Sequence, residues 1–274
     1  MKQLRYLIYY LTKAIIGKKN ASMQYLKPYL KDVEKNLKNY DVLNDCHSNK
    51  VWTMWLQDEI PEIVEVCLKT IKKIYPETII ITEKNLQNFV EVPKHIQSKY
   101  KNKQISMPHY SDYIRCLLLE KYGGLWLDAS LYMLDKVPEF ITKQEFFILT
   151  EPTQKAISNF FIYSKSNNYI IKAMRIFLEQ YWQKERKAIN YFFFHHFFML
   201  LCKKNKNCKQ YFKQMKHWTN AQIRYFVDHP QTNFNQNLWE YLKITSFMYK
   251  INRKDLNAMN NPNGFYHYIL THNN

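Results

Sequence analysis

Glycine is scarce in this sequence, with only four among 274 residues. No Walker loop and no GxGxxG, GxSxG or HExxH pattern occurs in it. These absences argue against P-loop nucleoside triphosphatases, dinucleotide-dependent enzymes, hydrolases with a nucleophile elbow, and zinc proteases of the HExxH type. If the chain is an enzyme, we expect its chemistry to come from a carboxylate that binds a metal ion.

Close cysteine pairs and long apolar runs are also missing. The five cysteines are an odd number without a CxxC pair, so we expect free, reduced thiols in a cytosolic protein and no zinc site. The apolar N-terminal segment is too short and too charged to span a bilayer, and no signal-peptide cleavage site follows it. No internal repeat or low-complexity linker is visible.

Acidic residues are outnumbered, since 40 Lys and Arg stand against 23 Asp and Glu, for a formal net charge of +17. This balance favours an anionic partner, such as a phosphate-rich ligand, a nucleic acid or an anionic membrane. Hydrophobic residues make up 46% of the chain, which excludes disorder, and the length suits one domain with additions. The basic residues are scattered and no nucleic-acid-binding module is recognised, so we expect no nucleic acid partner.

Residues 1–45 are expected to form a helical extension. In residues 2–16, apolar side chains recur at helical spacing between basic ones, and a second helical pattern follows from residue 22. The apolar positions of the first segment are Leu4, Leu7, Ile8, Leu11 and Ile15. Two interpretations stay open: a basic amphipathic helix that anchors the protein at a membrane surface, or a helix docked on the rest of the protein.

Strand and helix patterns alternate after residue 46. Residues 50–56 and 78–82 are apolar strand patterns, and the helix between them begins near Pro61, which implies a parallel pair with a right-handed crossover. We expect 78–82 to be buried on both faces. Further expected elements are a helix at 110–122, strands at 124–134 and 157–163, and helices at 168–184 and 190–203. The order of the elements beyond them is not predicted.

Polar side chains at the ends of the strands predict a ligand site. In open sheets ligands bind beyond the carboxyl ends of the strands, which brings Asp128 and Gln57 to one crevice. Asp128 and Ser130, two residues apart on one strand, are expected to share a face and to bind a divalent cation. The alternative for Asp128 is a capping or turn aspartate at the end of the strand.

The helix before this strand carries Asp112 and Arg115 on one face. A surface ion pair is the ordinary interpretation. Because the helix is otherwise apolar, Asp112 is instead expected to accept hydrogen bonds from sugar hydroxyls, and Arg115 to bind carboxylate or phosphate oxygens. Gly123 is expected to cap the helix, and Gly124 to permit a close approach of backbone or ligand.

The sequence resembles the capsular polysaccharide synthesis proteins related to glycosyltransferase family 32. The resemblance covers about residues 50–254 and is carried by Val51-Trp52 and Trp55, by Ser111-Asp112-Tyr113-Ile114-Arg115, and by Tyr122-Gly123-Gly124-Leu125-Trp126-Leu127-Asp128-Ala129-Ser130. Weaker matches lie around Asn159, His195 and Lys250. Taken alone, Trp52, Trp55 and His195 would be assigned to the core.

The resemblance implies a GT-A fold, a nucleotide-sugar donor of the UDP-sugar type, a Mn²⁺ or Mg²⁺ ion, and retention at the anomeric carbon. Asp128 matches the first acid of the Asp-x-Asp motif of the family, and Ser130 replaces the second acid. Asp112 and Arg115 match the acid and base that contact the donor sugar. The substrate-binding positions implied or inferred are Trp52, Trp55, Gln57, Ser111, Gly124, Asn159, His195 and Lys250.

We therefore predict an α/β protein with a GT-A-like, Rossmann-type mixed sheet flanked by helices and an N-terminal helical extension. Residues 46–150 would form the nucleotide-sugar-binding half and 151–274 the acceptor-side half. The predicted function is transfer of a hexose or N-acetylhexosamine to a saccharide or lipid-linked saccharide in surface polysaccharide synthesis, in the cytoplasm at the inner membrane surface. The alternative is a non-catalytic protein that binds a glycan or a nucleic acid.

Overall fold

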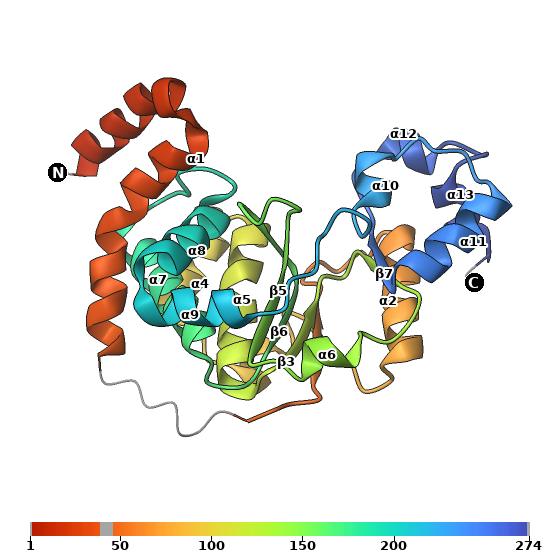
Figure 1. Cartoon of the computed structure of the whole chain (residues 1–274), viewed down its shortest axis with the longest axis horizontal. Helices are drawn as coiled ribbons and strands as arrows, with labels where there is room; N and C mark the ends of the chain where they lie inside the picture. Colours follow the sequence, from red (N-terminus) through yellow and green to blue (C-terminus); the bar gives the residue numbers. More distant parts are fainter. Residues whose placement is uncertain (1, 39–45, 273–274) are drawn as a thin grey trace.

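A five-stranded mixed sheet lies at the centre of the protein, in a computed structural model that describes residues 2–38 and 46–272 (Figure 1). The strand order is β2-β1-β3-β6-β5. β1 pairs parallel with β2 and β3, whereas β6 is antiparallel to both β3 and β5. The strands are β1 (Val51–Met54), β2 (Ile79–Ile81), β3 (Gly124–Leu127), β5 (Phe146–Thr150) and β6 (Ile157–Ser164). This arrangement confirms the expected fold class.

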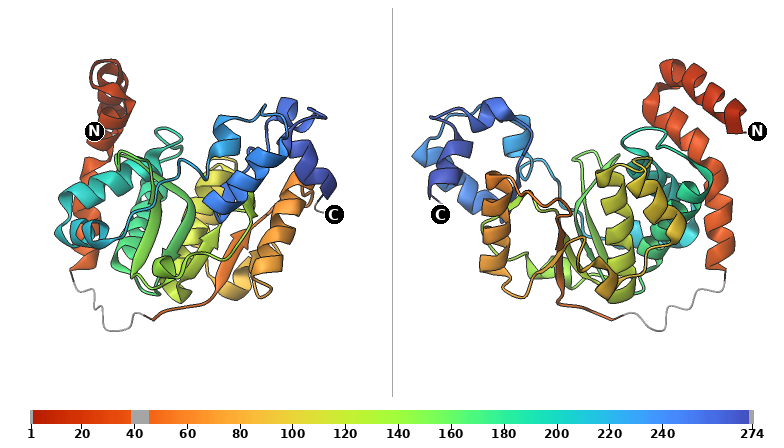
Figure 2. Two further views of the ribbon diagram at one scale, coloured as in Figure 1. Left: turned by 45° about the vertical axis from the view of Figure 1, so that its right-hand side comes forward. Right: turned by 180° about the vertical axis from the view of Figure 1, so that it is seen from behind.

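Helices cover both faces of the sheet. α2 (Glu62–Ile74) makes the expected crossover between β1 and β2 and lies on the opposite side of the sheet from α5 (Met107–Tyr122), as Figure 2 shows. α7 (Tyr169–Lys184) and α8 (Phe193–Lys204) pack on the α5 side, and α1 (Lys2–Leu37) packs outside them. The smaller helices of this part are α3 (Leu86–Phe89), α4 (Lys94–Lys101), α6 (Glu139–Thr142) and α9 (Lys206–Gln214).

The C-terminal part forms a cluster of short helices beside α2 (Figure 1). A two-stranded antiparallel sheet, β4 (Leu131–Met133) with β7 (Met248–Lys250), joins it to the strand that follows β3. The helices of the cluster are α10 (Tyr225–Asp228), α11 (Gln236–Thr245), α12 (Leu256–Met259) and α13 (Phe265–His272). The cluster thereby places β7 next to the carboxyl end of β3.

The N-terminal helix α1 is bent at Gly17, whose backbone (φ 78°, ψ 153°) is not helical. Beyond the bend the helix is docked on the protein: Tyr25 and Tyr29 are buried and both donate hydrogen bonds to Glu185, at 2.8 Å. The segment before the bend, residues 4–16, folds back so that Arg5 lies 4.4 Å over the Tyr25 ring. We call this segment the arm.

The apolar face of the arm is turned outward. Ile15 is 82% exposed, and the other large apolar side chains that are exposed there are Leu4, Leu7, Ile8, Tyr10, Leu11 and Ile16. Docking on the rest of the protein describes the helix beyond Gly17, whereas the membrane-surface interpretation of residues 2–16 stays a prediction. Within the described residues, no helix has the length and apolarity needed to cross a membrane. Residues 39–45 of the expected extension lie outside the described residues.

Three expectations about the strands need correction. The strand expected at 124–134 is divided into β3 and β4 by a turn, in which the N–H of Leu131 donates to the carbonyl of Asp128, so Asp128 and Ser130 do not share a strand face. β2 is an edge strand with Ile79 and Ile80 half-buried, so burial on both faces is wrong. β5 was not predicted, because a short run of four apolar residues before Thr150 cannot be told from a buried helix segment by its pattern.

The glycine pair fixes the start of β3. Gly123 (φ 65°) ends α5, and its N–H donates to the carbonyl of Leu119 at 3.0 Å, as expected for a C-terminal cap. Gly124 has φ 100°, and a Cβ there would lie 2.2 Å from the carbonyl oxygen of Lys50. Only glycine therefore lets β3 start this close to the chain that leads into β1.

Candidate active site

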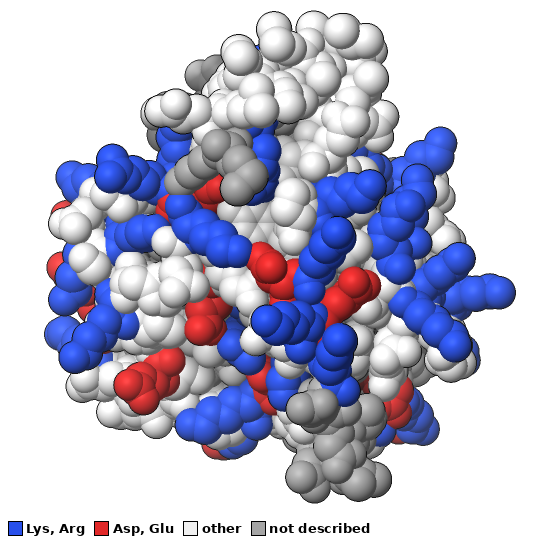
Figure 3. Space-filling view, turned by 90° about the vertical axis from the view of Figure 1, so that its left-hand side faces the viewer, with Lys and Arg blue, Asp and Glu red and all other residues white. Residues whose placement is uncertain are grey.

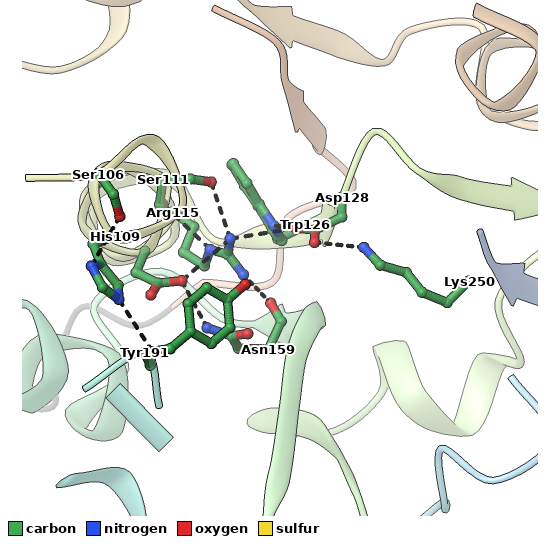
Figure 4. Close-up of polar contacts among 10 residues, drawn as sticks. Ser106, His109, Ser111, Arg115, Trp126, Asp128, Asn159, Tyr191 and Lys250 are labelled. Carbon is green, nitrogen blue, oxygen red and sulfur yellow. Dashed lines mark hydrogen bonds and ion pairs between the residues drawn. The ribbon is translucent and has the colours of Figure 1, made fainter. Parts of the chain in front are cut away.

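A cleft of about 310 Å³ lies at the carboxyl ends of β1 and β3. Its walls come from α5, from the turn after β3, from β6, from the start of α8 and from the segment after β7. This is the position expected for a ligand site in an open sheet. Figure 4 shows its polar contacts, which converge on Arg115 and Asp128.

Arg115 is the centre of the contacts and is almost fully buried. Its Nη2 lies 3.4 Å from Asp112 Oδ1 and 3.4 Å from Asp128 Oδ1, so one guanidinium joins the two carboxylates. The same group donates to Ser111 Oγ at 3.0 Å and to the backbone carbonyl of Asn159. The guanidinium also stacks over the Trp126 ring, 4.9 Å from its centroid. These contacts fix its orientation from several elements at once.

Asp128 sits at the end of β3 with its side chain 26% exposed. Lys250 Nζ lies 2.8 Å from its Oδ2, and the Trp126 indole donates to its Oδ1 at 2.9 Å. Burial acts to raise the pKa of Asp128, but Lys250 and Arg115 outweigh it and hold the pKa below its usual range. The carboxylate is therefore ionised and reaches the cleft.

Asp112 lies deeper, and its residue is 7% exposed. The side-chain amide of Asn159 donates to its Oδ1 at 2.8 Å. Burial raises the pKa of Asp112 against the opposing effects of Arg115 and His109, and Asp128 adds to the rise. The pKa of Asp112 is therefore raised and that of Asp128 lowered, although both carboxylates contact Arg115.

His195 is half-buried where α8 enters the cleft. Its Nδ1 is buried without a hydrogen-bond partner, and burial lowers the pKa of His195 to about 3. The imidazole is therefore neutral near neutral pH and keeps one ring nitrogen available to a ligand. His109 also lines the cleft, but both of its ring nitrogens are in contact, one with Ser106 Oγ and one with the Tyr191 carbonyl.

The donor set of the cleft bears on the expected metal ion. Asp128 and Ser130 lie two residues apart on the turn after β3, and both line the cleft. Among the described residues, no group of three or more His, Cys, Asp or Glu side chains is placed to hold a metal ion. An ion at Asp128 would therefore need further oxygen ligands from a bound diphosphate and from water, which is the usual way in which Mg²⁺ is bound.

Three expected substrate-binding residues do not line the cleft. Trp52 is fully buried, its indole donates to the Gly123 carbonyl at 2.9 Å, and its ring packs on Phe89, so its role is in the core. Gly124 is used for the backbone approach described above. Gln57 is exposed beyond the end of β1 and outside the lining of the cleft. The expected residues that do line it are Trp55, Ser111, Asp112, Arg115, Asp128, Ser130, Asn159, His195 and Lys250.

The cleft also contains residues that the sequence reasoning did not select. Those with polar or aromatic side chains include Trp126, His109, Tyr191, Arg253 and Lys254. The Arg253 guanidinium lies 4.9 Å from the Trp55 ring centroid. The sequence signal for the basic residues was the cluster of positive charges at residues 250–254. Nothing in the sequence placed this cluster beside Asp128.

The charges that line the cleft have a positive balance. Four cationic side chains, those of Arg115, Lys250, Arg253 and Lys254, face two carboxylates, those of Asp112 and Asp128. Two of the cations contact Asp128 directly. The excess of positive charge suits a ligand with phosphate groups.

Comparisons with known proteins identify the family of the chain. The family model for capsular polysaccharide synthesis proteins matches residues 6–269, which is wider than the expected 50–254 and includes α1. The solved structure of the PaToxG glycosyltransferase is similar over 84% of this chain and 99% of that chain, with 14% identity and a TM-score of 0.42. No curated protein matches. Since the family model spans nearly the whole chain, this protein belongs to the capsular polysaccharide synthesis family.

Proposed function

We propose that the protein is a glycosyltransferase that binds a nucleotide-sugar donor in the cleft beside Asp128. The observation that carries this proposal is the contact of one ionised carboxylate at the end of β3 with two cations, Lys250 and Arg115. A diphosphate needs cations, and a sugar ring needs hydroxyl acceptors such as the oxygens of Asp112. The family of the chain supports the same function, because polysaccharide synthesis requires sugar transfer.

The reaction breaks the bond between the anomeric carbon and the diphosphate. Negative charge grows on the departing phosphate while positive charge grows at the sugar, so preorganised cations accelerate the step. Lys250, Arg253 and Lys254 supply such cations on one wall of the cleft. A Mn²⁺ or Mg²⁺ ion held by Asp128, Ser130 and the diphosphate would neutralise further charge on the leaving group.

We propose retention at the anomeric carbon by attack from the side that the diphosphate leaves. The carboxylates that line the cleft, Asp112 and Asp128, both contact Arg115, so neither is a free nucleophile. The acceptor hydroxyl would form the new bond to the anomeric carbon and pass its proton to an oxygen of the departing phosphate. Asp112 and Asn159, joined by a hydrogen bond, would then orient sugar hydroxyls.

The donor is proposed to be a UDP sugar with a hexose or N-acetylhexosamine. Arg253 lies over the ring of the buried Trp55 in the lining of the cleft, and its flat guanidinium suits stacking with a pyrimidine ring. The acceptor is proposed to be a saccharide or lipid-linked saccharide of a capsular or other surface polysaccharide. The neutral His195 and the exposed ring of Tyr191 lie on the opposite wall, where they are available to the acceptor.

We also propose that the arm holds the protein at the inner surface of the cell membrane. Its outward face carries large apolar side chains, and Lys13, Lys18 and Lys19 lie in or directly after it. Such a helix lies in the interface of a bilayer rather than across it. Replacement of Leu7 and Leu11 by Ser should release the protein from vesicles, whereas retention on vesicles would contradict this role for the arm.

Purified protein incubated with a panel of nucleotide sugars and Mn²⁺ tests the transferase proposal. We expect Asp128→Asn to lower donor hydrolysis by roughly 100-fold or more, since it removes the charge that binds the ion and pairs with Lys250. The exposed Asp135→Asn is the matched control and should be unaffected. No hydrolysis of any donor by wild type, together with glycan binding or salt-dependent binding of random nucleic acid, would favour the non-catalytic alternative.

A further inference from the structure

A second hollow, of about 690 Å³, lies on the outer side of the molecule at the base of the arm. It is bordered by α1 just after Gly17, by the loop between β5 and β6, and by α8 and α9. We call it the lysine groove, because five lysines line it: Lys19, Lys155, Lys203, Lys209 and Lys213. Within residues 2–38 and 46–272, no aspartate or glutamate lines it.

The floor of the groove is apolar. Met23, Met199 and Phe212 contribute to it, and Phe212 packs edge-on against Phe198 at 5.7 Å between ring centroids. Lysines around an apolar floor form an amphipathic site, in which the ammonium groups bind an anion while the floor contacts hydrocarbon. This combination differs from that of the cleft, which contains both carboxylates and cations.

The position of the groove connects it with both the arm and the cleft. Lys19 follows Gly17 by two residues, and its ammonium donates to the Lys155 carbonyl, which ties the base of the arm to the β5–β6 loop. Along α8, Lys203 follows the cleft residue His195 by eight residues, or about 12 Å of helix. Figure 3 shows the arm as a largely uncharged projection at the top, with Lys and Arg gathered below it.

We propose that the lysine groove binds the phosphate headgroups of anionic bilayer lipids, so that the groove and the arm dock the protein together. The proposal rests on the membrane attachment proposed for the arm, and it adds a lipid class that the arm alone does not select. The arm would contribute the burial of apolar surface, and the lysines would contribute attraction to negative headgroups. The short distance along α8 would then keep the cleft near the bilayer surface, within reach of a lipid-linked acceptor.

Vesicle sedimentation with the full chain tests the proposal. Wild type should bind vesicles of phosphatidylcholine mixed with phosphatidylglycerol more tightly than phosphatidylcholine alone, and salt should reduce the difference. The variant K209Q/K213Q removes two groove charges four residues apart on α9, and we expect it to bind the anionic vesicles about 25-fold more weakly, from about 5-fold per lysine. The matched control K69Q/K73Q removes two exposed charges with the same spacing on α2.

The outcomes separate the groove from the other proposals. The control should bind like wild type, and an equal loss in both variants would overturn the proposal, because net charge alone would then explain the binding. Loss of oligonucleotide binding by K209Q/K213Q, with vesicle binding unchanged, would also overturn it. K209Q/K213Q should keep wild-type hydrolysis of a soluble donor, so failure of the transferase proposal would be seen separately in wild type.

Discussion

Lys250 Nζ lies 2.8 Å from Asp128 Oδ2, although 122 residues separate them in the sequence. The pair joins the turn after β3 to the end of β7 and closes one side of the cleft (Figure 4). A divalent cation that bound Asp128 would meet the ammonium group at this position. Lys250 and such an ion would therefore compete for one carboxylate, unless the lysine moved to the proposed diphosphate.

This competition predicts weak metal binding that improves when the lysine is removed. We expect Lys250→Met to raise the affinity for Mn²⁺ in the presence of UDP by roughly tenfold, and to weaken binding of the diphosphate itself. Calorimetric titration of Mn²⁺ measures both effects. Lys254→Met is the control, because it removes a cation from the same cleft without a contact to Asp128. Unchanged Mn²⁺ affinity in Lys250→Met would place the ion elsewhere.

Arg115→Lys should lower the rate of sugar transfer by roughly 100-fold, because an ammonium group cannot bridge Asp112 and Asp128 while also contacting Ser111. Arg175→Lys is the matched control, since Arg175 bridges Glu120 and Glu179 away from the cleft. We expect each variant to lose about 2 kcal/mol of stability, and only the first to lose activity. Urea unfolding and initial rates measure the two quantities, and equal losses of activity would mean that Arg115 acts through folding alone.

Gly124→Ala should reduce the free energy of unfolding by about 3 kcal/mol, because the new Cβ meets the Lys50 carbonyl and the backbone keeps a positive φ. Gly17→Ala is a useful comparison. Gly17 also has a positive φ, but no atom lies within 4 Å of its added Cβ, so the cost should be about 1 kcal/mol. Chemical denaturation measures the loss of unfolding free energy in both variants. Similar losses would contradict the prediction, because the contact with the Lys50 carbonyl would then add nothing to the cost at Gly124.

Acid should destabilise the protein through His195 and His196. Burial lowers the pKa of His195 to about 3 and of His196 to about 4, whereas an unfolded histidine titrates near 6.5. Between these values the unfolded chain binds more protons, so stability falls as the pH falls. The double variant His195→Gln with His196→Gln should lose less stability than wild type between about pH 7 and about pH 5. A parallel decline of the two proteins in urea unfolding would contradict this account.

The sequence predicted the parts of the fold whose side chains follow a local pattern. The unit from β1 through α2 to β2, the helix α5 and the cap at Gly123 all depend on residues close together in the chain. The break after β3 was not predicted, because Leu127 and Leu131 are both apolar and buried and continue the strand pattern across the turn. The pattern of apolar residues along the chain predicts which segments are buried. It does not predict a change of direction between two buried strands.

The sequence predicted that the acidic residues Asp112 and Asp128 lie in one cleft, but it predicted only some of the basic residues there. The placement of Asp112, Arg115 and Asp128 together follows from one helix and one strand joined by two glycines. Arg253 and Lys254 reach them only through the pairing of β4 with β7, a contact between distant segments that spacing does not encode. The resemblance implied that Trp52 binds substrate. In the structure its indole instead donates a hydrogen bond to the Gly123 carbonyl inside the protein.

The pairing of β4 with β7 also has a consequence for biosynthesis. Asp128 leaves the ribosome long before Lys250, so a nascent chain carries this carboxylate without its partner until residue 250 has been made. Contacts between distant segments are slow to form in folding. A nascent chain that ends before β7 therefore lacks the basic wall of the cleft.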